Sequence, residues 1–446
     1  MRESTRARII LVLGGLVFLA FARPGLMTFD SVEQLAEARE GFYTDCHPPA
    51  MAALWRVLDS IMPGGFLLLV LQVTTFLAGM YLVLRHAMSE RSAAIVACVL
   101  MLFPPVANPM AFMWKDSVMA GLLMLGAGLV LSPCRWARVA SLVCFCVGTA
   151  VKYNAFAATL PLIVLLFEWK QGLPWLKRYA LATTAWLGVT IAAMGTNSLL
   201  TDQQMHFWHS SLAIHDIAGV INYDDGFTED QVKQELAGTG LLIDTNVLQR
   251  IREVYALHDW TKLVYSDTQL WDLPINGRVP APQAQRDAIE RAWKSLVFGH
   301  PGAYLHHRWV IFLDAIGVTV KTRTAIPPRI MHWKGFLTNL GLPERSRPYQ
   351  NKWSNAYNWL WTHTPIYTQW LYIVLALALL PFSRGQRDVF AVLASGLVVE
   401  STLFFLAPTP DYRYSHWTVV CTCVAVAMLI ARRARRQPTN RAGPQL

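Results

Sequence analysis

Three acidic side chains follow the first apolar stretch of the chain and are spaced for a common helix face. Asp30, Glu33 and Glu37 stand at i, i+3 and i+7, so a helix over 31–40 would carry them in one stripe, with Asp30 near its cap. Carboxylates beside a membrane are costly to place there unless they have a task. We therefore expect chemistry in the loop 23–64, although two amphipathic helices lying on the membrane explain the same spacing.

Basic side chains on the side of the membrane that we predict to face outward could bind an anion. Each lies close to the end of an apolar run, where an unpaired charge is expensive. Cations that converge there would suit a phosphate or pyrophosphate at the membrane surface. The residues are Lys115, Lys152, Arg308 and Arg413.

Local pairing is the alternative explanation of these cations. Each would then neutralise a nearby carboxylate or extend its amine toward water, and no common anion site would exist. The local partners would be Asp116 for Lys115, Asp411 for Arg413 and Asp314 for Arg308, while Lys152 would extend to the interface.

The elements that must position these residues are apolar runs. The chain has 446 residues, of which 54% are hydrophobic and 15% are charged, whereas soluble domains average about a quarter charged residues. Several runs fall short of the about 20 residues that span a bilayer, and tilt can cover a few missing residues. We predict an all-α polytopic membrane protein with about ten transmembrane helices, at 9–22, 66–84, 93–106, 118–131, 139–151, 155–167, 179–200, 366–382, 389–407 and 417–431.

The positive charges indicate an orientation. The net charge is +10, and basic residues recur in alternate loops, as the positive-inside rule requires if the N-terminus is cytoplasmic. This distribution argues against a nucleic-acid partner for the basic tail. The first apolar run could instead be a cleaved signal peptide ending at Ala20-Phe21-Ala22, which would leave the later topology unchanged. The inward residues are Arg85, Arg91, Arg135, Arg138, Lys170, Lys177, Arg178, Arg384 and Arg387, followed by the arginines at 432–436.

Three parts follow from this topology. Residues 1–200 form an N-terminal transmembrane bundle that includes the loop 23–64. Residues 201–365 form a mainly helical extracytoplasmic domain, and residues 366–446 form further spans and a basic cytoplasmic tail. Within these parts we expect further helices at 50–61, after the helix-stopping run His47-Pro48-Pro49, at 228–241 and 282–297, and at 309–320, lying at the membrane surface or packed on the bundle.

Cysteines and histidines give no strong metal or disulfide pattern. Most of the seven cysteines lie in or beside apolar runs, so a disulfide framework is not expected. The histidines gather in the outward domain without metal-ligand spacing, which leaves a divalent metal as an untested cofactor. Nucleotide-binding glycine loops and a Gly-x-Ser-x-Gly elbow are absent from the sequence.

Several short motifs together resemble the GT-C glycosyltransferases, integral membrane enzymes that use polyprenyl-phosphate-linked sugars. The likeness is to little-characterised bacterial members and extends over nearly the whole chain. It is carried by Asp30 in the first outward loop, His47-Pro48-Pro49, Trp114-Lys115-Asp116, Lys152-Tyr153-Asn154-Ala155, His300-Pro301-x-x-Tyr304-Leu305-x-His307-Arg308 and Asp411-Tyr412-Arg413-Tyr414.

The resemblance implies an enzyme of the bacterial inner membrane whose active site faces the periplasm. It would move a sugar from a polyprenyl-phosphate carrier to a cell-envelope glycan, lipid or protein, with Asp30 as catalytic base and Glu33 as second acid. Members of the family with paired adjacent acids differ from this chain, in which Ser31 follows Asp30. The expected contacts to substrate and phosphate are His47, Lys115, Lys152, Tyr153, Asn154, Arg308, Tyr412 and Arg413.

Two other functions are compatible with many spans and a large outward domain. An O-antigen ligase or polymerase would use a pyrophosphate-linked glycan as donor. A transporter would be the non-enzymatic alternative, but we find no inverted repeat and no matched pair of broken spans in the sequence.

Overall fold

The computed structural model describes residues 3–167, 172–274, 279–319, 336–342 and 347–436. These residues form α-helices and no β-sheet, which confirms the predicted all-α class. The inward Lys170 and residues 437–446 of the basic tail lie outside the described residues.

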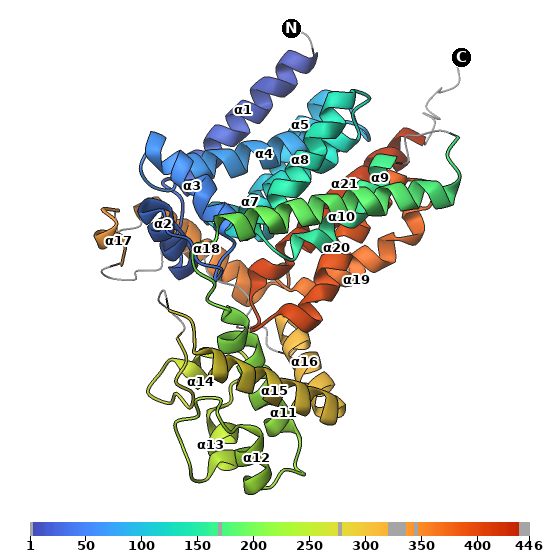
Figure 1. The fold of residues 1–446 in the computed structure, drawn as a ribbon. Coiled ribbons are helices and arrows are strands. Elements are labelled where there is room, and N and C mark those ends of the chain that lie inside the picture. The colour runs from blue at the N-terminus through green and yellow to red at the C-terminus, as the bar shows by residue number, and fades with distance from the viewer. Residues whose placement is uncertain (1–2, 168–171, 275–278, 320–335, 343–346, 437–446) are drawn as a thin grey trace, which may run out of the picture.

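One layer of the molecule consists of long apolar helices that pack side by side (Figure 1). Each predicted apolar run overlaps one of them, because a helix is the only way for such a run to satisfy its own main-chain groups. We call this set the bundle: α1 (Glu3–Ala22), α4 (Phe66–Leu84), α5 (Glu90–Leu102), α6 (Pro104–Ala111), α7 (Lys115–Val130), α8 (Arg135–Val151), α9 (Ala155–Phe167), α10 (Trp175–Leu200), α19 (Gln369–Leu379), α20 (Arg387–Leu406) and α21 (His416–Arg436).

Several bundle helices are long and apolar enough to cross a membrane. Four meet both criteria, namely α1, α4, α20 and α21 with its preceding turn. A fifth span results if α5 and α6, which meet at a bend of 70°, are counted as one broken segment. The bend occurs where Phe103 is followed by two prolines, so the predicted continuous run 93–106 is wrong at this point.

Helices α4 and α7 approach each other closely, and glycines make this approach possible. A Cβ added at Gly79 of α4 would lie 2.3 Å from the carbonyl carbon of Met124 in α7. Small residues allow helices in a membrane protein to pack at such short range. The contact matters for the site described below because it fixes α7, which begins at Lys115.

Replacement of Gly79 therefore tests the packing. Gly79→Ala should lower the free energy of unfolding by about 1–3 kcal/mol, since the added methyl group overpacks the helix pair. Gly188→Ala in α10 is the matched control, because a Cβ there meets no atom within 4 Å. Thermal unfolding of both variants in detergent is the measurement, and equal unfolding temperatures would contradict the packing.

A second, smaller layer lies below the bundle in Figure 1 and has its own hydrophobic core. We call it the outer domain. Its helices are α11 (Ile214–Tyr223), α12 (Glu229–Glu235), α13 (Val247–Val254), α14 (Thr261–Val264), α15 (Gln283–Gly299) and α16 (Pro301–Ala315).

The predicted helices of this region differ in their ends. The helix predicted at 282–297 corresponds to α15, and the one predicted at 228–241 ends early, at Glu235. Of the apolar segment predicted at 309–320, the first part is the second half of α16, which begins at Pro301, ends at Ala315 and packs against α11 and α20. Residue 320 lies outside the described residues. α16 therefore connects the outer domain to the bundle.

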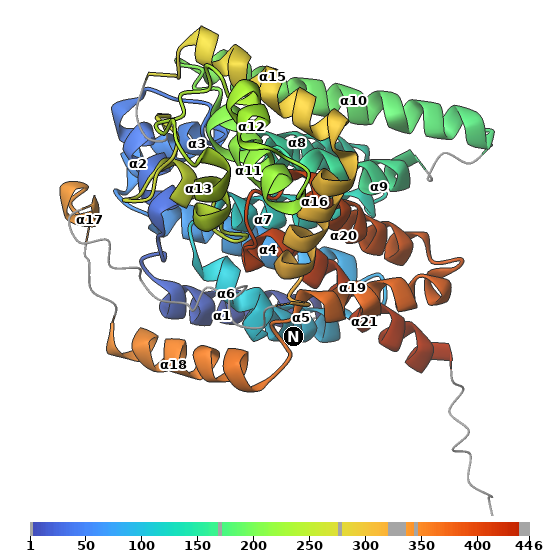
Figure 2. The same cartoon turned by 90° about the horizontal axis from the view of Figure 1, so that it is seen from below.

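The remaining helices cover the same end of the bundle. α2 (Phe29–Glu40) and α3 (Pro49–Ile61) pack on each other, which agrees with the predicted pair of helices in the first loop. α17 (Phe336–Asn339) and α18 (Pro348–His363) follow the outer domain, and the Tyr349 hydroxyl of α18 donates to the carbonyl of Ala20 at 2.8 Å. Figure 2 shows the outer domain in front of the bundle, with α18 along one side.

Candidate functional site

The site starts where the first turn of α2 is fixed to the residues before α7. The indole N–H of Trp114 donates to Oγ1 of Thr28, the N-cap of α2, at 2.8 Å. The Ser31 hydroxyl donates to the carbonyl of Met113 at 2.9 Å. These bonds hold Asp30, in the first turn of α2, close to the start of α7.

One guanidinium joins the first loop to the segment before the last helix. Arg413 Nη1 lies 2.8 Å from Oδ2 of Asp30, and Nε lies 2.9 Å from Oδ2 of Asp411. The rings of Trp114 and Tyr414 flank the guanidinium, with centroids 5.2 and 5.4 Å from its central carbon. Arg413 is thus held by two carboxylates and two aromatic faces, and its side chain is only 12% exposed.

Both predicted lysines lie beside this arginine. Lys152, which follows α8, forms an ion pair with Asp116, and its Nζ lies 5.0 Å from the centroid of the Tyr414 ring. Lys115 Nζ lies 3.0 Å from Nδ1 of His47. Residues from four distant segments therefore meet here, and we call the six charged ones the charged cluster: Asp30, Lys115, Asp116, Lys152, Asp411 and Arg413.

His47 links the charged cluster to the second predicted acid. Its Nε2 lies 3.4 Å from Oε2 of Glu33, while its Nδ1 faces Lys115. Glu37, the third acid of the predicted stripe, instead accepts hydrogen bonds from the main-chain N–H and the hydroxyl of Thr44. The stripe is therefore divided among three different partners, and only Asp30 reaches Arg413.

Asp30 is held in its ionised form. Burial by itself would raise the pKa of this carboxyl, but Arg413, His47 and Lys115 outweigh that effect and bring the pKa well below its usual range. A carboxylate with so low a pKa is a weak base as long as Arg413 remains bound to it.

Tyr153 and Asn154 occupy the turn between α8 and α9, directly after Lys152. Burial, followed by the nearby Asp45 and Cys46, raises the pKa of Tyr153 to about 12, so this side chain faces the connection between α2 and α3. The Oδ1 atom of Asn154 is buried and has no hydrogen-bond partner among the described residues. Both positions follow Lys152 of the charged cluster in the chain, and their predicted contacts to substrate stay predictions.

The side chain of Tyr412 packs away from the charged cluster, so the structure does not bring it together with the other predicted contacts. It is 2% exposed, and its hydroxyl donates to the carbonyl of Pro105 at 3.0 Å. Its ring packs against Tyr367 at a centroid distance of 5.4 Å. Tyr412 and Arg413 are neighbours in a short helical turn and point in different directions, so Tyr412 anchors the turn in the bundle.

Arg308 lies outside the charged cluster, so the structure does not bring it together with the other predicted phosphate-binding cations. Its guanidinium is fully buried and pairs with Asp216 of α11 at 2.5 Å. The local alternative is wrong, because Asp314 instead accepts from Nδ1 of His258 at 3.0 Å.

The other local alternatives hold only in part. Arg413 does pair with Asp411, but it binds Asp30 at the same time. Asp116 pairs with Lys152 rather than with its sequence neighbour Lys115, so Lys152 points inward and is 7% exposed. Sequence reasoning missed the aromatic contacts to Arg413, although Trp114 and Tyr414 lie in the quoted motifs. It also missed the pairing of Asp216 with Arg308.

No group of three or more His, Cys, Asp or Glu side chains among the described residues is placed to hold a metal ion. All seven cysteines are free in this structure.

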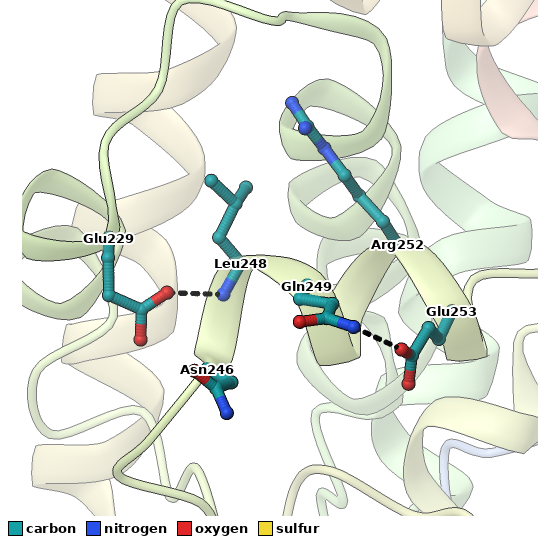
Figure 3. A pocket seen from close by; sticks show the side chains of 6 residues that line it. All are labelled: Glu229, Asn246, Leu248, Gln249, Arg252 and Glu253. Carbon is teal, nitrogen blue, oxygen red and sulfur yellow. Dashed lines mark hydrogen bonds between the residues drawn. The ribbon is translucent and has the colours of Figure 1, made fainter.

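A shallow pocket on the outer domain is unrelated to the charged cluster. It is lined by residues of α12 and α13, which Figure 1 places at the end of the molecule away from α7. One of its two carboxylates, Glu229, accepts a hydrogen bond from the N–H of Leu248 at 3.0 Å (Figure 3). Glu229 also accepts from the N–H of Val247 at 2.7 Å and thereby caps α13. Glu229 therefore has a structural role in this pocket, as the cap of α13.

Comparisons with protein-family models, with curated proteins and with solved structures found no significant match to the chain.

Proposed function

We propose that the chain is a GT-C-type glycosyltransferase of the bacterial inner membrane. It would move a sugar from a polyprenyl-phosphate carrier to a cell-envelope glycan, lipid or protein, at a site open to the periplasm. The observation that carries the proposal is the contact between Asp30 and Arg413, two residues from opposite ends of the chain, beside Lys115 and Lys152.

The balance of charge favours a monophosphate carrier. The charged cluster contains Lys115, Lys152 and Arg413 as cations and an equal number of carboxylates. Little positive charge therefore remains to compensate a pyrophosphate. A single phosphate can be accommodated when Arg413 and Lys115 turn toward it, because a planar guanidinium binds two phosphate oxygens at once.

In the proposed reaction, an acceptor hydroxyl attacks the anomeric carbon of the sugar. The new bond forms between this oxygen and the carbon, the bond from the carbon to the phosphate oxygen breaks, and the phosphate leaves with the electron pair. Asp30 takes the proton of the hydroxyl, while Arg413, Lys115 and Lys152 stabilise the leaving charge. Attack from the face opposite the phosphate inverts the anomeric configuration.

Donor binding would also prepare the base. Arg413 is shared between Asp30 and Asp411 in the ligand-free protein. A phosphate that draws Arg413 away from Asp30 removes the contact that lowers the pKa of this buried carboxylate, so Asp30 becomes a stronger base only when the donor is present.

In the proposed topology the bundle crosses the membrane, and its four or five candidate spans are among the helices that do so. α1 begins and α21 ends on the side of the bundle away from the outer domain (Figure 1). The basic residues of α21 lie at that end, as expected for the cytoplasmic side, and the charged cluster lies at the other. Large apolar side chains of α1, such as Leu13 and Val17, are more than half exposed and suit contact with lipid.

The donor preference tests the proposal. The purified full chain in nanodiscs would be incubated with radiolabelled sugars linked to polyprenyl monophosphate and, separately, with a pyrophosphate-linked glycan, together with a cell-envelope extract as acceptor source. We expect label to move to the acceptor, with release of polyprenyl phosphate, only from a monophosphate donor. Turnover of the pyrophosphate donor alone would instead indicate an O-antigen ligase or polymerase.

A further inference from the structure

A second group of buried polar residues connects the outer domain with the bundle. Asp216 of α11 and Arg308 of α16 form an ion pair in which both side chains are 0% exposed. Asp216 also lies 3.2 Å from Nε2 of His307 and accepts from the indole N–H of Trp293 at 2.9 Å. The carboxylate thus contacts three side chains from two other helices and fixes the position of Arg308.

The other end of Arg308 reaches the bundle. Its Nη1 donates to the carbonyl of Ala407 at 2.9 Å. Ala407 is the C-cap of α20, is 1% exposed, and packs with Ile311 of α16 and Leu403 of α20. Tyr414, whose ring contacts Arg413 and Lys152, packs against the same small core.

The segment that follows Ala407 links the end of α20 to the charged cluster, so the position of that end affects the position of the cluster. It runs Ala407-Pro408-Thr409-Pro410-Asp411, and each proline fixes one backbone dihedral angle. Asp411 then binds the main-chain N–H and the Nε of Arg413. A short and stiff connection therefore leads from the end of α20 to the guanidinium that contacts Asp30.

We propose that Arg308 is a positioning residue, which holds the end of α20 and thereby sets Arg413 against Asp30. This proposal rests on the proposed function, because it assigns Arg308 a role in preparing that site. A buried ion pair is a costly way to gain stability, since apolar residues of similar volume often serve as well or better. We infer that the ion pair instead fixes the orientation of the Arg308 guanidinium, because this planar group can bind Asp216 and the carbonyl of Ala407 at once.

A double substitution separates positioning from folding. Arg308→Met with Asp216→Asn removes both charges and keeps an acceptor for Trp293, so no unpaired charge is left buried. We expect an unchanged unfolding temperature but faster amide hydrogen exchange in residues 407–415 of the full chain. The affinity for farnesyl phosphate, a soluble polyprenyl monophosphate, should fall roughly ten-fold. The reason is that the contact between Arg413 and the phosphate would be lost only in part, whereas its complete loss would lower the affinity by about 10–100-fold.

The control is Asp224→Asn, which weakens the ion pair between Asp224 and His300 elsewhere in the outer domain. It should leave both the exchange of 407–415 and the affinity unchanged. Wild-type exchange or wild-type affinity in the double variant would each overturn the positioning role. If wild-type protein does not bind farnesyl phosphate at all, the proposed function fails, and the exchange measurement alone decides whether Arg308 positions this segment.

Discussion

Asp30→Asn should reduce glycosyl transfer by about 10²–10⁴-fold, the range expected for loss of a general base, while the fold stays intact. The amide has nearly the same volume and can still accept a hydrogen bond from Arg413, but it cannot take the acceptor's proton. Transfer of radiolabelled sugar from a polyprenyl-monophosphate donor is the measurement.

For the same variant we expect donor binding to change in the opposite direction from transfer. Removal of the Asp30 charge leaves Arg413 less neutralised, so the affinity for farnesyl phosphate should stay the same or rise while transfer is lost. Glu40→Gln, at the exposed end of the same helix, is the matched control and should transfer at the wild-type rate. Undiminished transfer by folded Asp30→Asn protein would remove Asp30 from the mechanism.

Arg413→Gln should weaken binding of farnesyl phosphate by about 10–100-fold, the value of one charge-assisted hydrogen bond. It should also change the pH dependence of transfer. Arg413 lowers the pKa of Asp30, whereas burial acts in the opposite direction, so the pKa must rise when the cation is removed. Protonation of Asp30 would then begin at a higher pH, and the acid limb of the pH–rate profile should move upward.

Two further variants serve as controls that distinguish a loss of phosphate binding from a loss of folding. Arg413→Lys keeps the charge between Asp30 and Asp411 but offers one donor centre instead of a planar fork, so its affinity should be intermediate. Arg384→Gln, an exposed arginine at the opposite end of the bundle, should bind as the wild type does. Unchanged affinity in Arg413→Gln would show that this guanidinium does not bind the donor phosphate.

The apolar pattern predicted the helices well, and two runs match their helices residue for residue. Phe66–Leu84 and Ala155–Phe167 are α4 and α9 with the same ends. The apolar pattern does not determine the number of spans. α9, for example, has only 13 residues, and its placement in a membrane depends on its tilt and on the neighbouring helices. Composition therefore fixes the class of fold more firmly than it fixes the count of crossings.

The site could be predicted where motifs place a charge near the end of a helix, as at Asp30, Lys115, Lys152 and Arg413. The site could not be predicted where it depends on the direction in which a side chain points or on a partner far away in the sequence. Tyr412 and Arg413 are adjacent, and only the geometry of their turn sends one inward. Arg308 finds its partner in Asp216, far earlier in the chain, and no local spacing indicates that pairing.

Photo-crosslinking of the carrier lipid tests the central claim most directly. A polyprenyl phosphate with a photoreactive group beside the phosphate would be incubated with the full chain in nanodiscs and irradiated, and the labelled peptides would be identified by mass spectrometry. We expect label in the segments around Trp114, Tyr153 and Tyr414 together, suppressed by excess farnesyl phosphate. Label confined to other parts of the chain, or label that farnesyl phosphate does not displace, would contradict a phosphate site at the charged cluster.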